Sequence, residues 1–312
     1  MPDDLALTSL TTRRAKQNEA VREYVDESTA ANTRRAYRSD WQDFEVWCAA
    51  HHEQALPASP ETVARYLTDL AKVAKTATLL RRLSSISVAH QFADLETPTR
   101  TVLVRKTMRG IRRQKAAGRE VVTQKEAAVT AIVRDFVEVF PETPTGLRNK
   151  ALILIGFAGA FRRSELVALD MTDVKFSSEG VTITVRQSKT DQEGEGIQKG
   201  IPYGRKAATC PVRALRAWLD AADIVSGPVF RPIDRHGNIK PQALTAQSVA
   251  LIVKQAAAKA GYDPTTFSGH SLRAGLATAA AQAGVSERII MAQTGHKSVT
   301  VARRYIRRGE LF

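Results

Sequence analysis

The stretch Val181-Thr182-Ile183-Thr184-Val185 is β-branched throughout and is the clearest strand signal in this chain of 312 residues. A polar loop and a second short strand near Ile197–Pro202 follow it, which predicts a hairpin. Elsewhere apolar residues recur at helical spacing, with no internal repeat or low-complexity tract. The sequence therefore predicts a mainly α-helical fold with a small antiparallel β-sheet.

The first half of the chain has the pattern of a helical bundle. Ser59-Pro60-Glu61 combines a cap residue, a proline for the first turn and an acid, which indicates a helix start. A last helix is predicted from about Val102 to Lys115. The apolar stripes of the earlier helices are Trp41, Phe44, Trp47 and Cys48; Val63, Tyr66, Leu67 and Leu70; and Leu79, Leu80, Leu83 and Ile86.

We expect two domains from the length and the pattern. A short leader over 1–27 precedes a helical domain over 28–118, and a linker over 119–127 leads to a second domain over 128–312. In the second domain, helical pattern runs from Lys125 to Phe140 and through the apolar run Ala151–Phe161. After the hairpin, helical pattern returns at Pro211 and continues to the end.

The charge balance indicates a polyanionic partner. The chain has 46 Lys and Arg against 32 Asp and Glu, a net charge of +14 and a pI of about 10.0. Residues 28–125 carry 17 bases and 9 acids, and residues 126–312 carry 25 and 17. Because the excess lies on both lobes rather than on one amphipathic anchor helix, nucleic acid fits better than a membrane surface.

Several classes of protein are excluded or disfavoured. Ala151–Phe161 is too short to span a membrane, and the acidic start lacks the order of a signal peptide. Cys48 and Cys210 stand in no CxxC motif, so we expect no cysteine-based metal site and a reducing, cytoplasmic location. A nucleic-acid partner would place the protein near the nucleoid. A two-metal nuclease needs converging carboxylates, and Asp170 and Asp173 support this function only weakly. Capping or turn roles fit these two acids better.

Two basic clusters in the helical domain are predicted to contact phosphates. Arg105, Arg109, Arg112 and Arg113 share one face of the predicted last helix, with Met108 and Ile111 turned away from it. The acids that normally alternate with bases on a solvated helix face are absent there. The predicted DNA contacts are Arg81, Arg82, Arg105, Lys106, Arg109, Arg112 and Arg113.

Four features of the second domain bear on chemistry, although each is ordinary when taken alone. They are Arg162 with Glu165, His270 with Arg273, His296 after Gly295, and Tyr305 inside the basic stretch Arg303–Arg308. Taken separately, Arg162 with Glu165 indicates a salt bridge, and His270 with Arg273 indicates two neighbours on a helix. A lone tyrosine in a helix, such as Tyr305, is more often a core or rim residue. Together they fit attack on a phosphodiester, which builds negative charge on the non-bridging oxygens.

The residue types suit that reaction. Two arginines can clamp phosphate oxygens and stay charged at any working pH. A tyrosine with a pKa of about 10 needs a positive field and a proton acceptor before it can act as a nucleophile. Histidine exchanges protons near neutral pH. Lys189, at the tip of the predicted hairpin, is the candidate acid for the departing sugar oxygen.

The order of these motifs resembles the tyrosine recombinase (phage integrase) family, most closely its two-domain Cre-type members. The resemblance covers nearly the whole chain from about residue 28. It is carried by Phe161–Leu166, Ser188–Thr190, Gly269–Gly275, Ala283–Ser286 and Ala302–Arg307. Within the first motif the family register favours Arg162 over Arg163.

The resemblance implies a role for each candidate residue. Tyr305 attacks the phosphate and holds the 3′ end, while Arg162 and Arg273 bind the non-bridging oxygens. His296 adds a hydrogen bond to the phosphate, and Lys189 protonates the leaving 5′ oxygen. His270 assists proton transfer. Glu165 positions its neighbours as a buried acid.

The resemblance also implies an assembly. Two lobes close as a C-shaped clamp on double-stranded DNA with inverted-repeat core sites, and a homotetramer joins two such sites through a Holliday junction. No metal, ATP or other cofactor is needed, and accessory proteins can set direction. The chain departs from the pattern where it stops at Phe312, seven residues after Tyr305. We therefore expect no long C-terminal docking helix. Because only a short leader precedes the first predicted helix, we also expect no extra arm-binding domain.

Two other functions stay open at this point. A topoisomerase-like enzyme would use the same cleavage chemistry to relax supercoils without pairing two sites. A regulator with a silent catalytic lobe would bind DNA and not cut it, although every expected catalytic residue type is present.

Overall fold

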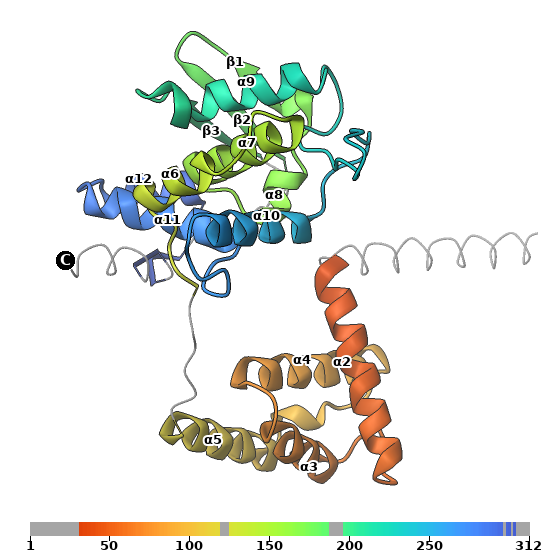
Figure 1. Cartoon of the computed structure of the whole chain (residues 1–312). Helices are drawn as coiled ribbons and strands as arrows, with labels where there is room; N and C mark the ends of the chain where they lie inside the picture. The colour runs from red at the N-terminus through yellow and green to blue at the C-terminus, as the bar shows by residue number, and fades with distance from the viewer. Residues whose placement is uncertain (1–30, 119–124, 187–195, 296–297, 301, 304–312) are drawn as a thin grey trace, which may run out of the picture. The chain divides into compact units, whose positions relative to one another are not determined.

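Helices account for most of the residues that the computed structural model describes, which are 31–118, 125–186, 196–295, 298–300 and 302–303. The chain divides into two compact units, Met1–Val122 and Thr123–Phe312. A three-stranded antiparallel sheet lies in the second unit (Figure 1). The predicted fold class, mainly helical with a small antiparallel sheet, is confirmed. The predicted clamp stays a prediction, since each unit is described by itself.

The first unit is a small bundle in which α2 packs against α4 and α3 packs against α5 (Figure 1). Its helices are α2 (Ala31–Ala50), α3 (Pro60–Ala71), α4 (Thr76–Phe92) and α5 (Val102–Ala117), with a 3-10 turn at Pro98–Arg100. The predicted helix start is confirmed, because Ser59 Oγ accepts a hydrogen bond from the backbone N–H of Thr62 and Pro60 occupies the first turn.

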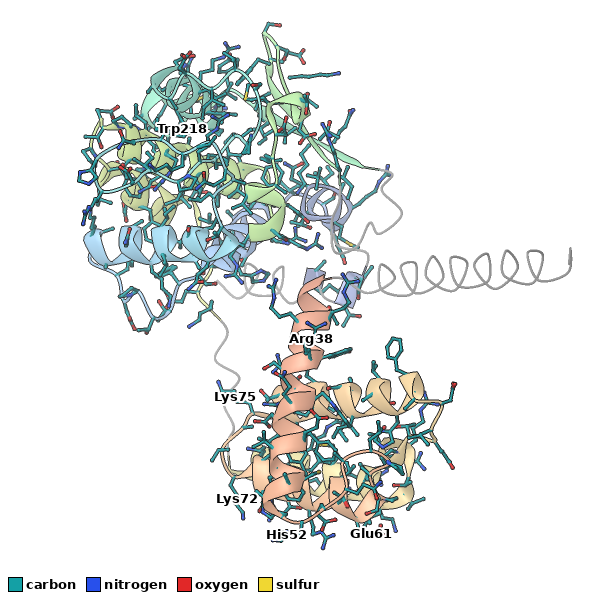
Figure 2. The ribbon with its side chains drawn as sticks, turned by 90° about the vertical axis from the view of Figure 1, so that its right-hand side faces the viewer. Arg38, His52, Glu61, Lys72, Lys75 and Trp218 are labelled. Carbon is teal, nitrogen blue, oxygen red and sulfur yellow. The ribbon has the colours of Figure 1, made fainter. Side chains whose placement is uncertain are left out.

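Aromatic rings fill the centre of this unit. The rings of Phe44 and Tyr66 meet edge to face with centroids 4.9 Å apart, and both side chains are buried. Leu79, Ile86 and Val104 complete the core from α4 and α5. Figure 2 shows the polar residues Arg38, His52, Glu61, Lys72 and Lys75 on the outside of the unit, where the structure exposes them.

The predicted strands form a hairpin, to which the fold adds a third strand. β2 (Gly180–Val185) pairs antiparallel with β3 (Ile197–Pro202), and Ile183 lies opposite Lys199. The added strand, β1 (Val174–Phe176), pairs with the other edge of β2. Three residues are too few to show an alternation in the sequence, so β1 was not predicted.

Helices surround a central helix, α7, in the second unit. Its residues Ala151–Ile155 are buried on every side, because α6, α9, α10 and α11 all pack against it (Figure 1). Trp218 of α9 lies inside this unit and donates its indole N–H to Val229 O at 2.9 Å (Figure 2). The helices are α6 (Thr130–Glu138), α7 (Pro144–Ala158), α8 (Arg163–Val167), α9 (Pro211–Ala221), α10 (Ala246–Lys259), α11 (Gly269–Gln282) and α12 (Glu287–Thr294).

Two helical predictions are wrong in part. Residues 125–129 are not helical, because the N–H groups of Glu126 and Ala128 donate to Thr266 O and Ser271 O instead of forming a helical turn. Residues 222–245 interrupt the helices predicted after Pro211, and within them Gly227 and Gly237 take left-handed backbone angles that an α-helix does not contain. None of the helices within the described ranges combines the length and apolar character needed to cross a membrane.

Candidate active site

The turn after α7 is held by side chains from three other elements. Three consecutive carbonyls accept these hydrogen bonds: Ala158 O from Gln293 Nε2 at 3.0 Å, Gly159 O from Lys199 Nζ at 2.6 Å and Ala160 O from Arg273 Nη1 at 2.9 Å. Ala160 itself has a left-handed backbone with φ of 47°. The turn that leads into Arg162 is therefore fixed by α12, β3 and α11 at once.

Arg162 caps α8 and is locked to Glu165. Its backbone N–H donates to Glu165 Oε2 at 2.9 Å, and its Nη1 donates to Glu165 Oε1 at 2.5 Å. The Glu165 side chain is 3% exposed and that of Arg162 is 19% exposed. Arg162 Nη2 also donates to Gly295 O at 3.4 Å, so the end of α12 lies against it. The neighbouring Arg163 is exposed.

The two predicted residues of α11 lie near this pair. Arg273 is 2% exposed and reaches Ala160 O, while His270 stands one turn earlier and is partly open to solvent. Protein atoms packed around the His270 ring, and then the positive charges of Arg273, Arg163 and Arg162, lower its pKa below the ordinary value. At neutral pH the imidazole is therefore uncharged and able to accept a proton.

Lys199 was not predicted and belongs to the same cluster. It is 3% exposed, and its Nζ lies 4.7 Å from the centroid of the Phe161 ring. Burial lowers its pKa to about 8; Glu165 opposes this shift, and Arg273 and Arg162 add to it. One signal was available in the sequence, because strand alternation puts Lys199 on the same inward face as Ile197 and Ile201.

Three predicted residues, Lys189, His296 and Tyr305, lie outside the described residues. Described neighbours border them in the sequence. Ala302 is buried with Ala277 of α11 and Ile290 of α12, and Arg303 Nε lies 3.2 Å from Glu287 Oε1. The chain thus lies on α11 and α12 two residues before the predicted nucleophile.

Asp170 and Asp173 accept hydrogen bonds within a turn, which is the role that the sequence favoured for them. Asp170 Oδ1 accepts from the N–H of Thr172 at 3.1 Å, and Asp173 Oδ2 accepts from the N–H of Asp170 at 3.0 Å. Asp173 Oδ1 also accepts from Arg186 Nε at 2.5 Å. This contact anchors the end of β2 just before the segment that contains Lys189.

The basic face of α5 faces solvent. Val104, Met108 and Ile111 are buried in the core, as the sequence predicted for the last two. The opposite face is exposed and has no acidic residue in the helix, and it consists of Arg105, Lys106, Arg109, Arg112 and Arg113. This arrangement is suited to bind phosphates.

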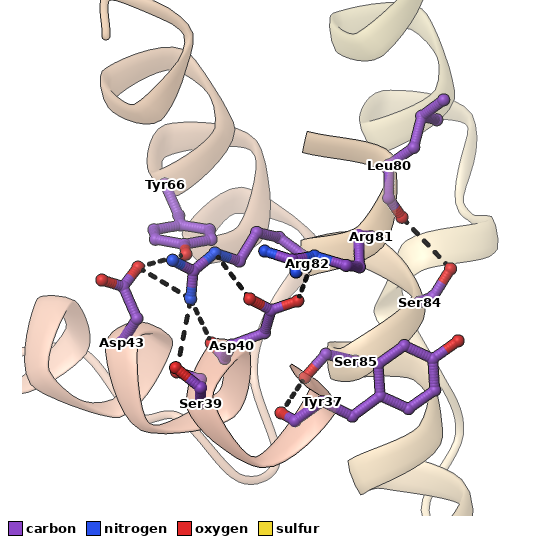
Figure 3. Close-up of polar contacts among 10 residues, drawn as sticks. All are labelled: Tyr37, Ser39, Asp40, Asp43, Tyr66, Leu80, Arg81, Arg82, Ser84 and Ser85. Carbon is purple, nitrogen blue, oxygen red and sulfur yellow. Dashed lines mark hydrogen bonds and ion pairs between the residues drawn. The ribbon is translucent and has the colours of Figure 1, made fainter. Parts of the chain in front are cut away.

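Arg81 and Arg82 join two helices (Figure 3). Arg82 Nε lies 3.3 Å from Asp40 Oδ1 and its Nη1 lies 3.1 Å from Asp43 Oδ2, while Arg81 Nε lies 3.0 Å from Asp40 Oδ2. The Arg82 side chain is 14% exposed and that of Arg81 is 48% exposed. This geometry favours a structural role for Arg82, and only Arg81 presents much surface to a phosphate.

Comparison with known proteins decides the family. A model of the phage integrase family matches residues 126–310, and a model of the phage integrase N-terminal SAM-like domain matches residues 22–97. This chain belongs to the phage integrase family. Every candidate catalytic residue of the recombinase falls within 126–310, and α5 lies between the two matched stretches. The resemblance that the motifs predicted is confirmed.

Individual relatives agree with this assignment. An integrase/recombinase XerD homologue of Selenomonas ruminantium is 45% identical over 294 residues, which cover 92% of this chain and 85% of the relative. The recombinase Cre of Escherichia phage P1 is 25% identical over 280 residues, 84% of this chain and 80% of Cre. These names do not favour the topoisomerase-like or regulatory alternatives.

Solved structures show the same fold. An integrase of the Tn1549 transposon, in complex with transposon right-end DNA, matches with a TM-score of 0.64 and 14% identity, covering 92% of each chain. A lambda integrase dimer bound to a core site matches with a TM-score of 0.59 and 17% identity, covering 96% of each chain. The recombinase therefore shares its mainly helical architecture with these integrases.

Proposed function

We propose that this recombinase cuts and rejoins double-stranded DNA through Tyr305. The tyrosine oxygen attacks the scissile phosphorus, a Tyr–O–P bond forms to the 3′ end, and the bond to the 5′ oxygen breaks. The 5′ oxygen leaves with a proton from Lys189. Attack of a 5′ hydroxyl on the phosphotyrosine reverses these steps, so rejoining conserves the bond energy and needs neither ATP nor a metal.

The clustering of buried cations around one turn carries this proposal. Arg273 holds Ala160 O, and Arg162 follows that residue by two positions and is locked to Glu165. A guanidinium carries five N–H donors in one plane, so a fixed contact on one side sets the direction of the others. Donors that are oriented before the reaction stabilise charge that develops on phosphate oxygens. This supports a phosphate clamp made by Arg162 and Arg273.

The remaining roles follow from this clamp. His270, kept neutral by its surroundings, accepts the proton of Tyr305, and His296 donates a hydrogen bond to a phosphate oxygen. Glu165 is the positioning residue of Arg162. In the first unit we propose that Arg81 and the basic face of α5 contact DNA phosphates and fix the register of the enzyme on its site.

Recombination needs two sites, so we propose a homotetramer that joins two inverted-repeat core sites and passes through a Holliday junction. Cleavage and rejoining on a single site would only restore the original DNA. Accessory proteins can set the direction of exchange.

Trapping covalent DNA in cells tests the proposal and requires no assumption about the target sequence. The enzyme and its Tyr305→Phe variant are expressed, the cells are lysed in denaturant, and DNA that stays joined to the protein is sequenced. We expect one enriched site with inverted repeats for the native enzyme and none for Tyr305→Phe. Covalent DNA that persists in Tyr305→Phe would contradict the assignment of the nucleophile.

A further inference from the structure

Lys199 occupies a position where the fold needs only an apolar side chain. Its neighbours on the inward face of β3 are Ile197 and Ile201, and it lies opposite Ile183 of β2. The side chain is 3% exposed. Taking an ammonium out of water is unfavourable unless its new contacts compensate for the lost hydration. A lysine at this position therefore lowers the stability of the sheet relative to an apolar residue.

Lys199 contacts the turn after α7, which leads into Arg162. Its Nζ donates to Gly159 O at 2.6 Å and lies 4.7 Å from the Phe161 ring centroid. Gly159 follows the last residue of α7, where the helix dipole places partial negative charge and favours a cation. Arg162 comes directly after Phe161, so Lys199 ties the sheet to the backbone from which the arginine projects.

The charges around this ammonium are unbalanced. The charged groups that face it are Glu165 of α8, Arg162 before α8 and Arg273 of α11. Two guanidiniums and one ammonium thus share one carboxylate among the described residues. Since its pKa is about 8, the ammonium is mostly protonated at pH 7 and loses its proton as the pH rises to 9.

We infer that Lys199 is a positioning residue of the recombination reaction, which holds the Gly159 carbonyl so that Arg162 meets the scissile phosphate and which adds its charge to the clamp. This inference rests on the proposed function, because it needs the Arg162 and Arg273 site to be the site of cleavage. It assigns a function to a buried residue of β3.

A cleavage assay at saturating DNA tests the inference. Lys199→Met keeps the length of the side chain and removes its donor and charge. The matched control is Lys175→Met, which changes an exposed lysine of the neighbouring strand β1. The substrate is a nicked suicide duplex that carries the site recovered from cells, and the rate of covalent adduct formation is measured together with DNA affinity.

We expect Lys199→Met to slow adduct formation about 10- to 100-fold, the cost of a misplaced catalytic group. DNA affinity should stay within about twofold, because one misplaced contact to a single phosphate is a small part of the grip on the duplex. Lys175→Met should match the native enzyme in both measurements. An unchanged rate for folded Lys199→Met would overturn the inference, and absence of any adduct with the native enzyme would instead refute the proposed function.

Lys199→Arg decides the question if the methionine variant does not fold. Arginine stays charged at every working pH. The ratio of the Lys199→Arg rate to the native rate should therefore rise between pH 7 and pH 9, as only the native enzyme loses charge at this position. Other titrating groups, Tyr305 among them, are common to both proteins and cancel in the ratio. A ratio that does not change with pH, or a folded Lys199→Arg enzyme that cannot cleave, would overturn the inference.

Discussion

Each of the two units has a network of cations and acids around a buried carboxylate, and the two networks differ in charge balance. In the first unit, Arg81 and Arg82 meet the carboxylates of Asp40 and Asp43 (Figure 3). Among the described residues of the second unit, three cations share one carboxylate: they are Arg162, Lys199 and Arg273, and the carboxylate is Glu165. Counted over the residues that the structure describes, the first network is neutral and the second has an excess of positive charge.

The difference indicates what each network is for. A balanced network satisfies its own charges and joins α2 to α4, so its contribution is to the fold. An excess of buried cations disfavours the fold by itself and is stabilised when an anion enters. The second network therefore has the character of a binding site for a phosphate, while the first does not.

Arg273→Met should have the largest effect, and it should fall on cleavage. Loss of one oriented donor at developing charge slows a reaction about 100- to 1,000-fold. Stability should change by only about 1 kcal/mol, because relief of the excess positive charge offsets the lost bond to Ala160 O. Adduct formation on the suicide duplex and urea unfolding measure the two effects. A stability loss as large as the loss in cleavage energy would remove the distinction between the networks.

Arg82→Met should show the opposite pattern. Removal of one partner from a buried, balanced network leaves Asp40 poorly compensated and should cost about 3 kcal/mol of unfolding free energy. The rate of adduct formation at saturating DNA should be unchanged, because the second unit keeps its site. Cleavage that falls 100-fold in folded Arg82→Met would place the first network in the chemistry.

The basic face of α5 should affect affinity and leave the chemistry alone. Arg109→Ala and Arg112→Ala should each lower DNA affinity about uniformly across sequences and reduce the salt slope of binding by about 1. Lys72→Ala is the control, since Lys72 is exposed but pairs with Asp69 at 2.8 Å. Fluorescence anisotropy titrations at several salt concentrations measure both quantities. An equal change in the control would argue against a specific basic face.

The smallest effect concerns pH and stability. The pKa of Lys199 is lowered to about 8 in the fold, so above this pH the unfolded chain binds more protons and the native enzyme gains stability. Between pH 8 and pH 9 we expect a gain of about 1 kcal/mol relative to Lys199→Met. Urea unfolding of both proteins at the two pH values measures it. Parallel pH dependence of the two proteins would show that Lys199 titrates normally.

Local patterns made much of this molecule predictable. The strand of β-branched residues, the Ser59 cap and the buried side of α5 all depend on residues close together in the sequence. The contact between Arg162 and Glu165 is local in the same way, because residues three apart meet at a helix start.

Contacts between distant segments were not predictable. Lys199 finds its acceptor 40 residues earlier in the chain, and the two acids that hold Arg82 lie about 40 residues before it in α2. A basic pair on a helix therefore gave no sign that one arginine faces inward. The helical pattern over 125–129 misleads for the same reason, since the hydrogen-bond partners of this extended segment lie around the start of α11.

The central claim is that the excess cations of the second network meet the charge on the scissile phosphate. A duplex with a neutral methylphosphonate at that position removes the charge and leaves the rest of the DNA intact. The slowing caused by Arg273→Met is measured on both duplexes, which completes a double-mutant cycle between side chain and phosphate. We predict that a penalty of about 100-fold or more on phosphate falls below about 10-fold on methylphosphonate. An equal penalty on both duplexes would contradict the claim.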